Sequence, residues 1–155
     1  QVDKLMTSLV FDTKFHDADK LIEGAKEKLF KFDKLNDVSE NIQKNISTTD
    51  ALKTYSLNLW KATKNPDQYD VKISGINVNR LIISGASPRG ISMMIKCARV
   101  NAWMDNRTSV LPEDIHAVFH ETIAHRLVFN PVYELRRTEI AKELTQEIIN
   151  KVSAP

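Results

Sequence analysis

Apolar residues recur at steps of three and four positions along most of this chain, and this spacing limits the fold more than any other feature of the sequence. The period places apolar side chains on one face of an α-helix, so it predicts a mainly all-α fold, a helical bundle. Signals for strands are sparse, and we expect at most one short two-stranded β pair, from residues near 108–110 and 127–129. The predicted helices cover residues 17–32, 35–46, 50–64, 88–105, 112–123 and 134–151, with a short helix near 76–83.

The composition is that of an ordinary globular chain. Its 155 residues suit one domain, or one domain with an arm, and Cys97 is the only cysteine, which excludes a disulfide framework. No apolar run approaches the roughly 20 residues that a membrane span needs, and the chain does not start with a signal peptide. We therefore expect a cytoplasmic protein without a membrane span. The net charge of +2 is too small to indicate binding to nucleic acid.

Glycine is scarce, and this excludes the familiar nucleotide-binding loops. Among the four glycines, only Gly85 and Gly90 have the spacing of a phosphate-binding P-loop, but Ile91 follows where that loop requires lysine. The G-x-G-x-x-G and G-x-S-x-G patterns are also missing from the sequence. A self-contained nucleotide hydrolase of a familiar kind is therefore excluded. The chain starts with glutamine rather than methionine, so we expect a fragment of a longer protein.

Arg89 breaks a local rule of helix composition. Ser87 suits the N-cap of the helix predicted over 88–105 and Pro88 suits its first position, which places Arg89 in the first turn. A cation there is unfavourable by about 0.3–1 kcal/mol, because the N-terminus of a helix carries a positive partial charge. The same end binds anions, so an arginine beside it can help to hold a phosphate. The alternatives are a surface arginine, or one paired with a carboxylate such as Asp105 or Glu121.

Five segments of the sequence follow a known order of motifs. Residues 84–90 read S-G-A-S-P-R-G, and residues 61–66 upstream read K-A-T-K-N-P. Residues 106–115 read N-R-T-S-V-L-P-E-D-I, residues 125–129 read H-R-L-V-F, and residues 148–155 read I-I-N-K-V-S-A-P. In order and spacing, these segments resemble the motifs of MoxR-type AAA+ ATPases.

The resemblance covers about residues 35–155 and implies that they form the C-terminal helical lid domain of such an ATPase. The α/β core that holds the Walker A and Walker B motifs then lies outside this chain. Residues 1–34 are expected to be an N-terminal arm, or the link from that core. The resemblance implies ATP with Mg as ligand of the full-length parent, with Mg ligands outside this chain. The chain alone is not expected to hydrolyse ATP.

The resemblance also assigns roles to the residues around Arg89. The arginine of the family motif G-A-S-P-R is the sensor 2 residue, which reaches the γ-phosphate of ATP, and this role falls on Arg89. Pro88 and Ser87 are expected beside the bound nucleotide. Lid closure would couple hydrolysis to movement of neighbouring subunits in a hexameric ring. The family acts in chaperone-like remodelling of protein clients, so the expected partners are the AAA+ core, neighbouring subunits and a protein client.

Two departures and one alternative accompany this interpretation. Leu111 stands where the family has threonine before P-E-D, so the helix that follows loses its side-chain cap, and Ser109 stands where an aromatic residue is usual.

The alternative is a free-standing helical module that binds a protein or DNA without nucleotide chemistry. Arg89 argues against this free-standing module, because such a module needs no cation in a capped first turn. Residues 107–126 also lack the basic face that recognition of DNA requires.

Several other residues invite functional interpretations. His116 and His120 lie four apart on one predicted helix, but no third metal ligand is evident, so we expect surface or structural roles and no metal site. Trp60 and Trp103 are expected in the core. Arg126 is a candidate for a subunit contact or for packing within the lid, and we do not place it among the catalytic residues.

Overall fold

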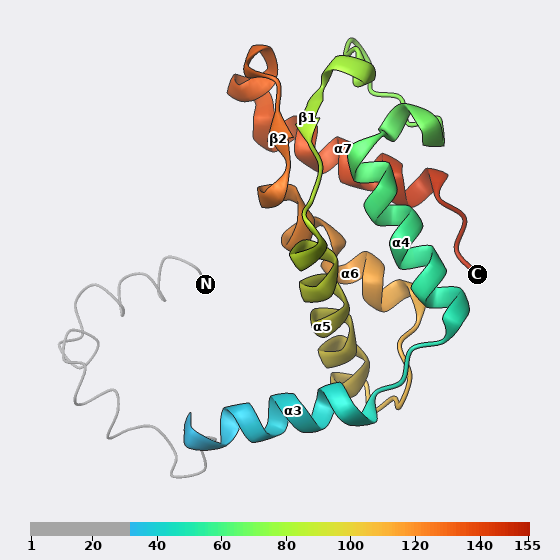
Figure 1. Cartoon of the computed structure of the whole chain (residues 1–155), viewed down its shortest axis with the longest axis vertical. Helices are drawn as coiled ribbons and strands as arrows, with labels where there is room; N and C mark the ends of the chain where they lie inside the picture. Colours follow the sequence, from blue (N-terminus) through green and yellow to red (C-terminus); the bar gives the residue numbers. More distant parts are fainter. Residues whose placement is uncertain (1–31) are drawn as a thin grey trace, which may run out of the picture. The chain divides into compact units, whose positions relative to one another are not determined.

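The structure is a computed structural model that describes residues 32–155 (Figure 1). Within this part, five α-helices and one small two-stranded antiparallel sheet confirm the mainly helical fold. The helix predicted from residue 17 falls outside the described residues. The chain divides into two units, Gln1–Val38 and Ser39–Pro155. The helices are α3 (Leu35–Asn45), α4 (Asp50–Lys64), α5 (Pro88–Met104), α6 (Pro112–Ile123) and α7 (Arg137–Lys151).

Local signals set the ends of these helices. Thr49 caps α4, because its hydroxyl accepts a hydrogen bond from the Leu52 amide at 3.2 Å. The bounds of α3, α4, α5 and α6 match the predicted ranges to within one residue at each end. The last helix begins at Arg137 rather than at residue 134, since Pro131–Arg136 forms a 3-10 helix. Periodicity and caps are therefore sufficient to predict most of the helical bounds.

The two strands of the sheet are not the pair that the sequence predicted. Strand β1 (Ile82–Ser84) pairs antiparallel with β2 (Val128–Phe129). The strand expected near 127–129 is confirmed, but the partner expected at 108–110 is wrong. Residues 108–110 pair with Ser47 instead. The Ser47 amide donates to the Thr108 carbonyl at 2.9 Å, and the Ser47 carbonyl accepts from the Val110 amide at 3.0 Å. Residues 76–83 hold a 3-10 turn and most of β1 instead of one short helix.

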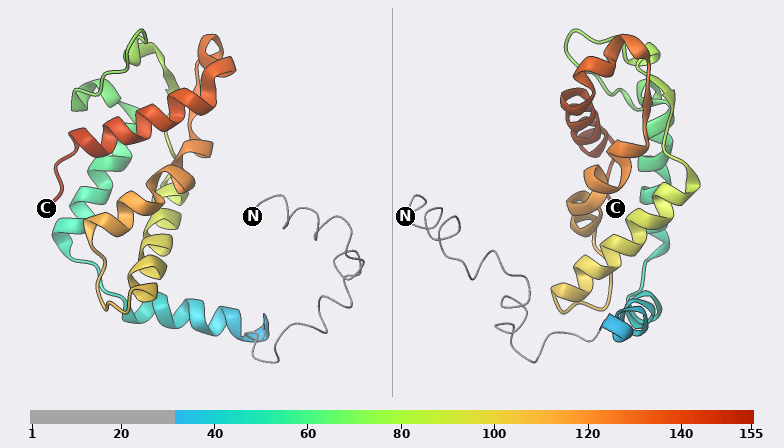
Figure 2. Two further views of the ribbon diagram at one scale, coloured as in Figure 1. Left: turned by 180° about the vertical axis from the view of Figure 1, so that it is seen from behind. Right: turned by 90° about the vertical axis from the view of Figure 1, so that its left-hand side faces the viewer.

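The core lies where α4, α5, α6 and α7 meet. Helix α6 lies against α5 and α7, and α7 also contacts α4, as Figure 2 shows from two sides. Each helix contributes fully buried apolar side chains, such as Leu59 of α4, Met94 of α5, Phe119 of α6 and Leu144 of α7. Truncating a side chain of this kind typically costs about 2–5 kcal/mol. This packing holds α5, whose first turn carries the candidate site.

The two tryptophans do not share the core environment that we expected. The buried stripe of α5 runs through Met94, Ala98 and Ala102 at steps of four. Trp103 is the next residue along and points away from that stripe, with 49% of its surface exposed, so its core prediction is wrong. Trp60 is only half-buried, and its indole N–H lies close to the candidate site.

A buried carboxylate holds the first turn of α6. Asp114 accepts a hydrogen bond from the Leu111 amide at 2.8 Å, which is one half of a capping box. Leu111 has no side-chain oxygen to supply the other half. Arg107 donates from its two terminal nitrogens to the two oxygens of Asp114, each at 2.6 Å. The start of α6 therefore depends on Asp114 rather than on a capping hydroxyl.

Replacing Leu111 by threonine is expected to raise the free energy of unfolding by about 0.5–1 kcal/mol, because the new hydroxyl can accept a hydrogen bond from the first turn of α6. Leu111 is exposed, so little apolar burial is lost. Urea unfolding of the chain measures the change. Leu111→Val is the matched control, since valine has the shape of threonine without the oxygen. Equal stability of the two variants would contradict the capping argument.

Candidate functional site

The candidate site lies where β1 runs through a short loop into α5. Pro88 is the first residue of α5 and Arg89 the second, and both are exposed. Ser87 occupies the N-cap position with extended backbone (φ −71°, ψ 163°), but its hydroxyl makes no capping hydrogen bond. The structure thus brings Ser87, Pro88 and Arg89 together at an exposed helix N-terminus, in the order that the sequence predicts.

Arg89 has no hydrogen bond or ion pair to another side chain within residues 32–155. Asp105, one of the two carboxylates considered as its partner, pairs with Arg107 at 2.9 Å. Glu121 makes no ion pair with Arg89 in the described part of the chain. The first turn of α5 also contains no acidic residue. The positive end of the helix and the guanidinium group are therefore not neutralised here, which suits an anion.

The back of the first turn of α5 packs against the end of α6. Gly90 is buried, and a Cβ atom at this position would lie 3.0 Å from Cδ of Arg126 and 3.5 Å from Cδ1 of Ile123. Nε of Arg126 donates to the Thr122 carbonyl at 3.0 Å. Arg126 therefore contacts the start of α5 while its Nε bonds the domain's own backbone, which agrees with a packing role.

Helix α4 makes a contribution to the site that the sequence did not predict. The indole N–H of Trp60 donates to the Ala86 carbonyl at 2.6 Å, and the Ala86 amide donates to the Thr63 hydroxyl at 3.3 Å. These bonds join the last turn of α4 to the loop before Arg89. Thr63 and Ala86 lie within the motifs over 61–66 and 84–90, but Trp60 lies outside both, so no signal in the sequence pointed to it.

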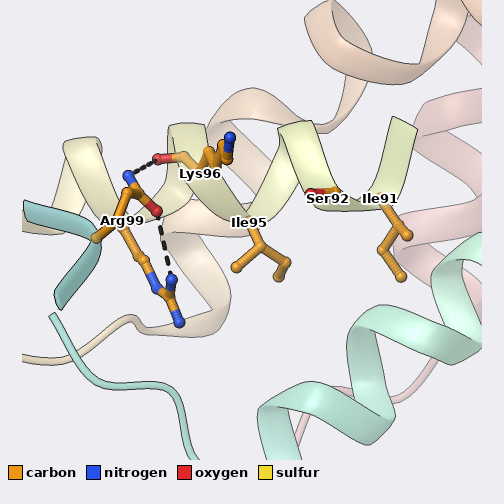
Figure 3. Close-up of a pocket in the computed structure, with 6 residues that line it drawn as sticks. Ile91, Ser92, Ile95, Lys96 and Arg99 are labelled. Carbon is orange, nitrogen blue, oxygen red and sulfur yellow. Dashed lines mark hydrogen bonds between the residues drawn. The ribbon is translucent and has the colours of Figure 1, made fainter. Parts of the chain in front are cut away.

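A shallow groove runs along another face of α5. It has a volume of about 330 Å³, and Figure 3 shows Ile91, Ile95, Lys96 and Arg99 along it. Gln43 donates a hydrogen bond to the Lys96 carbonyl and accepts one from Arg99, both 3.3 Å long. A neighbouring cavity of about 270 Å³ shares Arg99. Nε of Arg99 and the Thr48 hydroxyl are buried without a hydrogen-bond partner within residues 32–155. The groove is lined by Gln43, Ile91, Ser92, Ile95, Lys96 and Arg99.

The histidines of α6 have partners of their own. His116 forms a hydrogen bond with the Tyr55 hydroxyl at 2.7 Å, and His120 forms one with the Thr145 hydroxyl at 2.8 Å. The described residues contain no group of three or more side chains placed to hold a metal ion. In residues 32–155 there is also no helix with the length and apolar character needed to cross a membrane.

Comparison with known proteins gives a consistent family. Residues 76–152 match the AAA lid domain family. The MoxR protein of Methylorubrum extorquens is 40% identical over 95% of this chain and 43% of its own length. The chaperone MoxR1 of Mycobacterium tuberculosis is 32% identical over 66% of this chain and 25% of its own length. A crystal structure of a proposed ATPase from Cytophaga hutchinsonii aligns with a TM-score of 0.64 and 29% identity, over 77% of this chain and 36% of that one. The chain spans less than half the length of each of these proteins.

Proposed function

The chain is homologous to MoxR proteins over most of its length and contains an AAA lid domain, and from this we propose that it closes over ATP bound by a core domain outside the chain. One observation carries the proposal: Arg89 is exposed and unpaired among the described residues, at a helix N-terminus without acidic residues. Its guanidinium group can donate hydrogen bonds to the γ-phosphate as sensor 2. A fixed cation there stabilises the charge that develops during phosphoryl transfer.

Ser87 and Pro88 are proposed to lie beside the nucleotide. The Ser87 hydroxyl is not used as a cap, so it is available to a phosphate oxygen. Pro88 has no amide hydrogen and starts the helix without an unsatisfied donor. ATP brings the phosphoryl group and Mg, while the Mg ligands and the Walker motifs belong to the core. The residues of this chain then bind and neutralise the terminal phosphate.

The wider assignments also belong to this proposal. Residues 35–155 are the lid domain and residues 1–34 the arm or link from the core. Neighbouring subunits of a hexameric ring and a protein client are the proposed partners, in the cytoplasm. A chaperone role is supported by the name of the relative from Mycobacterium tuberculosis. In this proposal, closure of the lid transmits hydrolysis to the neighbouring subunits.

Replacing Arg89 by alanine in the full-length parent is expected to reduce ATP turnover at least tenfold, a barrier increase of about 1.4 kcal/mol or more. The affinity for nucleotide should remain near normal, because the core supplies most of the binding contacts. Turnover and nucleotide affinity are measured in parallel.

Lys96→Ala is the matched control for this experiment, because it removes another exposed cation of α5 beyond the first turn. Its turnover should equal that of the unmodified protein. Unchanged turnover in Arg89→Ala would exclude the sensor 2 role and favour a helical binding module instead.

A further inference from the structure

We infer that the last turn of α4 positions Arg89, because Trp60 and Thr63 hold the backbone of the loop from which α5 starts. The loop consists of Gly85, Ala86 and Ser87, between β1 and α5. What Arg89 does for the reaction rests on the proposed function, whereas the way it is held rests on the contacts between α4 and this loop. Trp60 and Thr63 act through Arg89 and are positioning residues.

Both backbone polar groups of Ala86 are satisfied by α4. The Ala86 carbonyl accepts from the indole N–H of Trp60 at 2.6 Å, and the Ala86 amide donates to the Thr63 hydroxyl at 3.3 Å. The Thr63 hydroxyl in turn donates to the Trp60 carbonyl at 2.7 Å. Ala86 is fully buried, so these groups cannot turn to water if the contacts are lost. The hydrogen bonds therefore fix the loop in one position.

The residue before Ala86 lies directly against the backbone of α4. A Cβ atom on Gly85 would be 2.8 Å from Cα and 2.9 Å from the amide nitrogen of Lys64, which leaves no room for a side chain. The ammonium group of Lys64 also lies over the ring of Trp60, 4.1 Å from its centroid. This cation–π contact holds the indole from its face while its edge bonds the loop.

The loop is held on its other side as well. Ser84 pairs with Val128 in the strand pair immediately before Gly85. Only Ser87 and Pro88 separate Ala86 from Arg89, and the ring of Pro88 fixes one of the intervening backbone angles. The position of the Ala86 backbone therefore determines where the Arg89 side chain leaves the helix. A shift of about 1 Å at such a group can cost a large factor in rate.

The test compares Trp60→Phe with Trp103→Phe in the full-length parent. Phenylalanine keeps an aromatic ring and removes the indole N–H, and Trp103 is an exposed tryptophan of α5 without a hydrogen bond to the loop. We expect Trp60→Phe to lower kcat about three- to tenfold, the loss expected from one hydrogen bond, while nucleotide affinity is unchanged. Trp103→Phe should leave kcat unchanged.

A second comparison separates positioning from a general loss of structure. If Trp60 acts through Arg89, then Trp60→Phe combined with Arg89→Ala should be no slower than Arg89→Ala alone. Multiplied losses in the double variant would overturn the inference. Equal kcat in the two tryptophan variants would overturn it too, and the proposed function would still stand if Arg89→Ala alone lost activity.

A third measurement tests the contact without reference to catalysis. In the 155-residue chain, the indole N–H of Trp60 should exchange with solvent much more slowly than that of Trp103, because it is bonded to a buried carbonyl. Hydrogen exchange of the two indole resonances by NMR gives the comparison directly. Equal exchange rates would mean that α4 does not hold Ala86, whatever Arg89 contributes to hydrolysis.

Discussion

Replacing Asp114 by alanine is expected to lower the free energy of unfolding by about 3–5 kcal/mol. The carboxylate is fully buried and accepts four hydrogen bonds, two from Arg107, one from the Asn101 side chain and one from the Leu111 amide. Its loss leaves a partly buried guanidinium group and a helix-start amide without their acceptors. Urea unfolding of the chain measures the effect.

Two further variants test whether the loss comes from the buried carboxylate of Asp114. Asp105→Ala removes the exposed partner of Arg107 and should cost about 1 kcal/mol or less. Asp114→Asn keeps the shape of the side chain without its charge and should fall between the two alanine variants, so a comparison is available even if Asp114→Ala does not fold. A cost of Asp105→Ala equal to that of Asp114→Ala would contradict the central role of the buried carboxylate.

The same carboxylate makes stability depend on pH. Burial alone raises the pKa of Asp114, but hydrogen bonds from Arg107, the Leu111 amide and Asn101 outweigh it, and the pKa lies below its usual value of 3.8. Because the pKa is lower in the folded state, the stabilisation is complete above the unfolded-state pKa. It is lost as the pH falls below about 4, through the pKa of the folded state. Asp114→Asn should show a shallower loss of stability over that range.

Replacing Gly85 by alanine is expected to lower the free energy of unfolding by about 1–3 kcal/mol, through steric overlap with α4. The added Cβ would lie 2.5 Å from Cγ of Lys64 and within 3 Å of two of its backbone atoms. A side chain can move away, but the backbone of a helix cannot do so without losing hydrogen bonds. Under the proposed function, the displaced loop should also reduce ATP turnover of the full-length parent, because Arg89 follows it.

Gly90→Ala provides the control for this substitution. The added methyl group would meet the flexible Cδ of Arg126 at 3.0 Å, and alanine favours a helical position over glycine by about 0.5–1 kcal/mol. The steric cost and the gain in helix propensity nearly cancel, so the free energy of unfolding is expected to change by less than about 1 kcal/mol. Equal losses in the two glycine variants, measured by urea unfolding, would show that contact with α4 does not distinguish Gly85.

Helix positions could be predicted because their signals are local. Thr49 at the start of α4 and Ser87 with Pro88 at the start of α5 lie next to the helices that they define. The partner of β2 could not be predicted, since β1 is more than forty residues away and only three residues long. Strands this short carry too little alternation to specify a partner.

The residues of the candidate site also differ in whether local signals predicted them. Arg89 was predicted because a cation in a first turn contradicts a local rule, and the structure places it there, exposed. Its role toward ATP remains a prediction. Trp60 was assigned to the core because it widens the apolar stripe of its helix. Its contact with the site could not be predicted, because the hydrogen bond spans 26 positions and depends on how α4 meets the loop. Contacts between distant segments follow from packing, which the spacing of apolar residues does not specify.

Because Trp60 is hydrogen-bonded to Ala86, its fluorescence can report on the loop before Arg89. The sequence contains two tryptophans, and Trp103 lies exposed at the far end of α5. In a Trp103→Phe chain, all indole fluorescence comes from a ring that contacts the loop before Arg89. Emission from an indole depends on the polarity around it, so release of the loop into water should shift the spectrum to longer wavelength. Release of the loop from α4 can therefore be followed in real time without an attached dye.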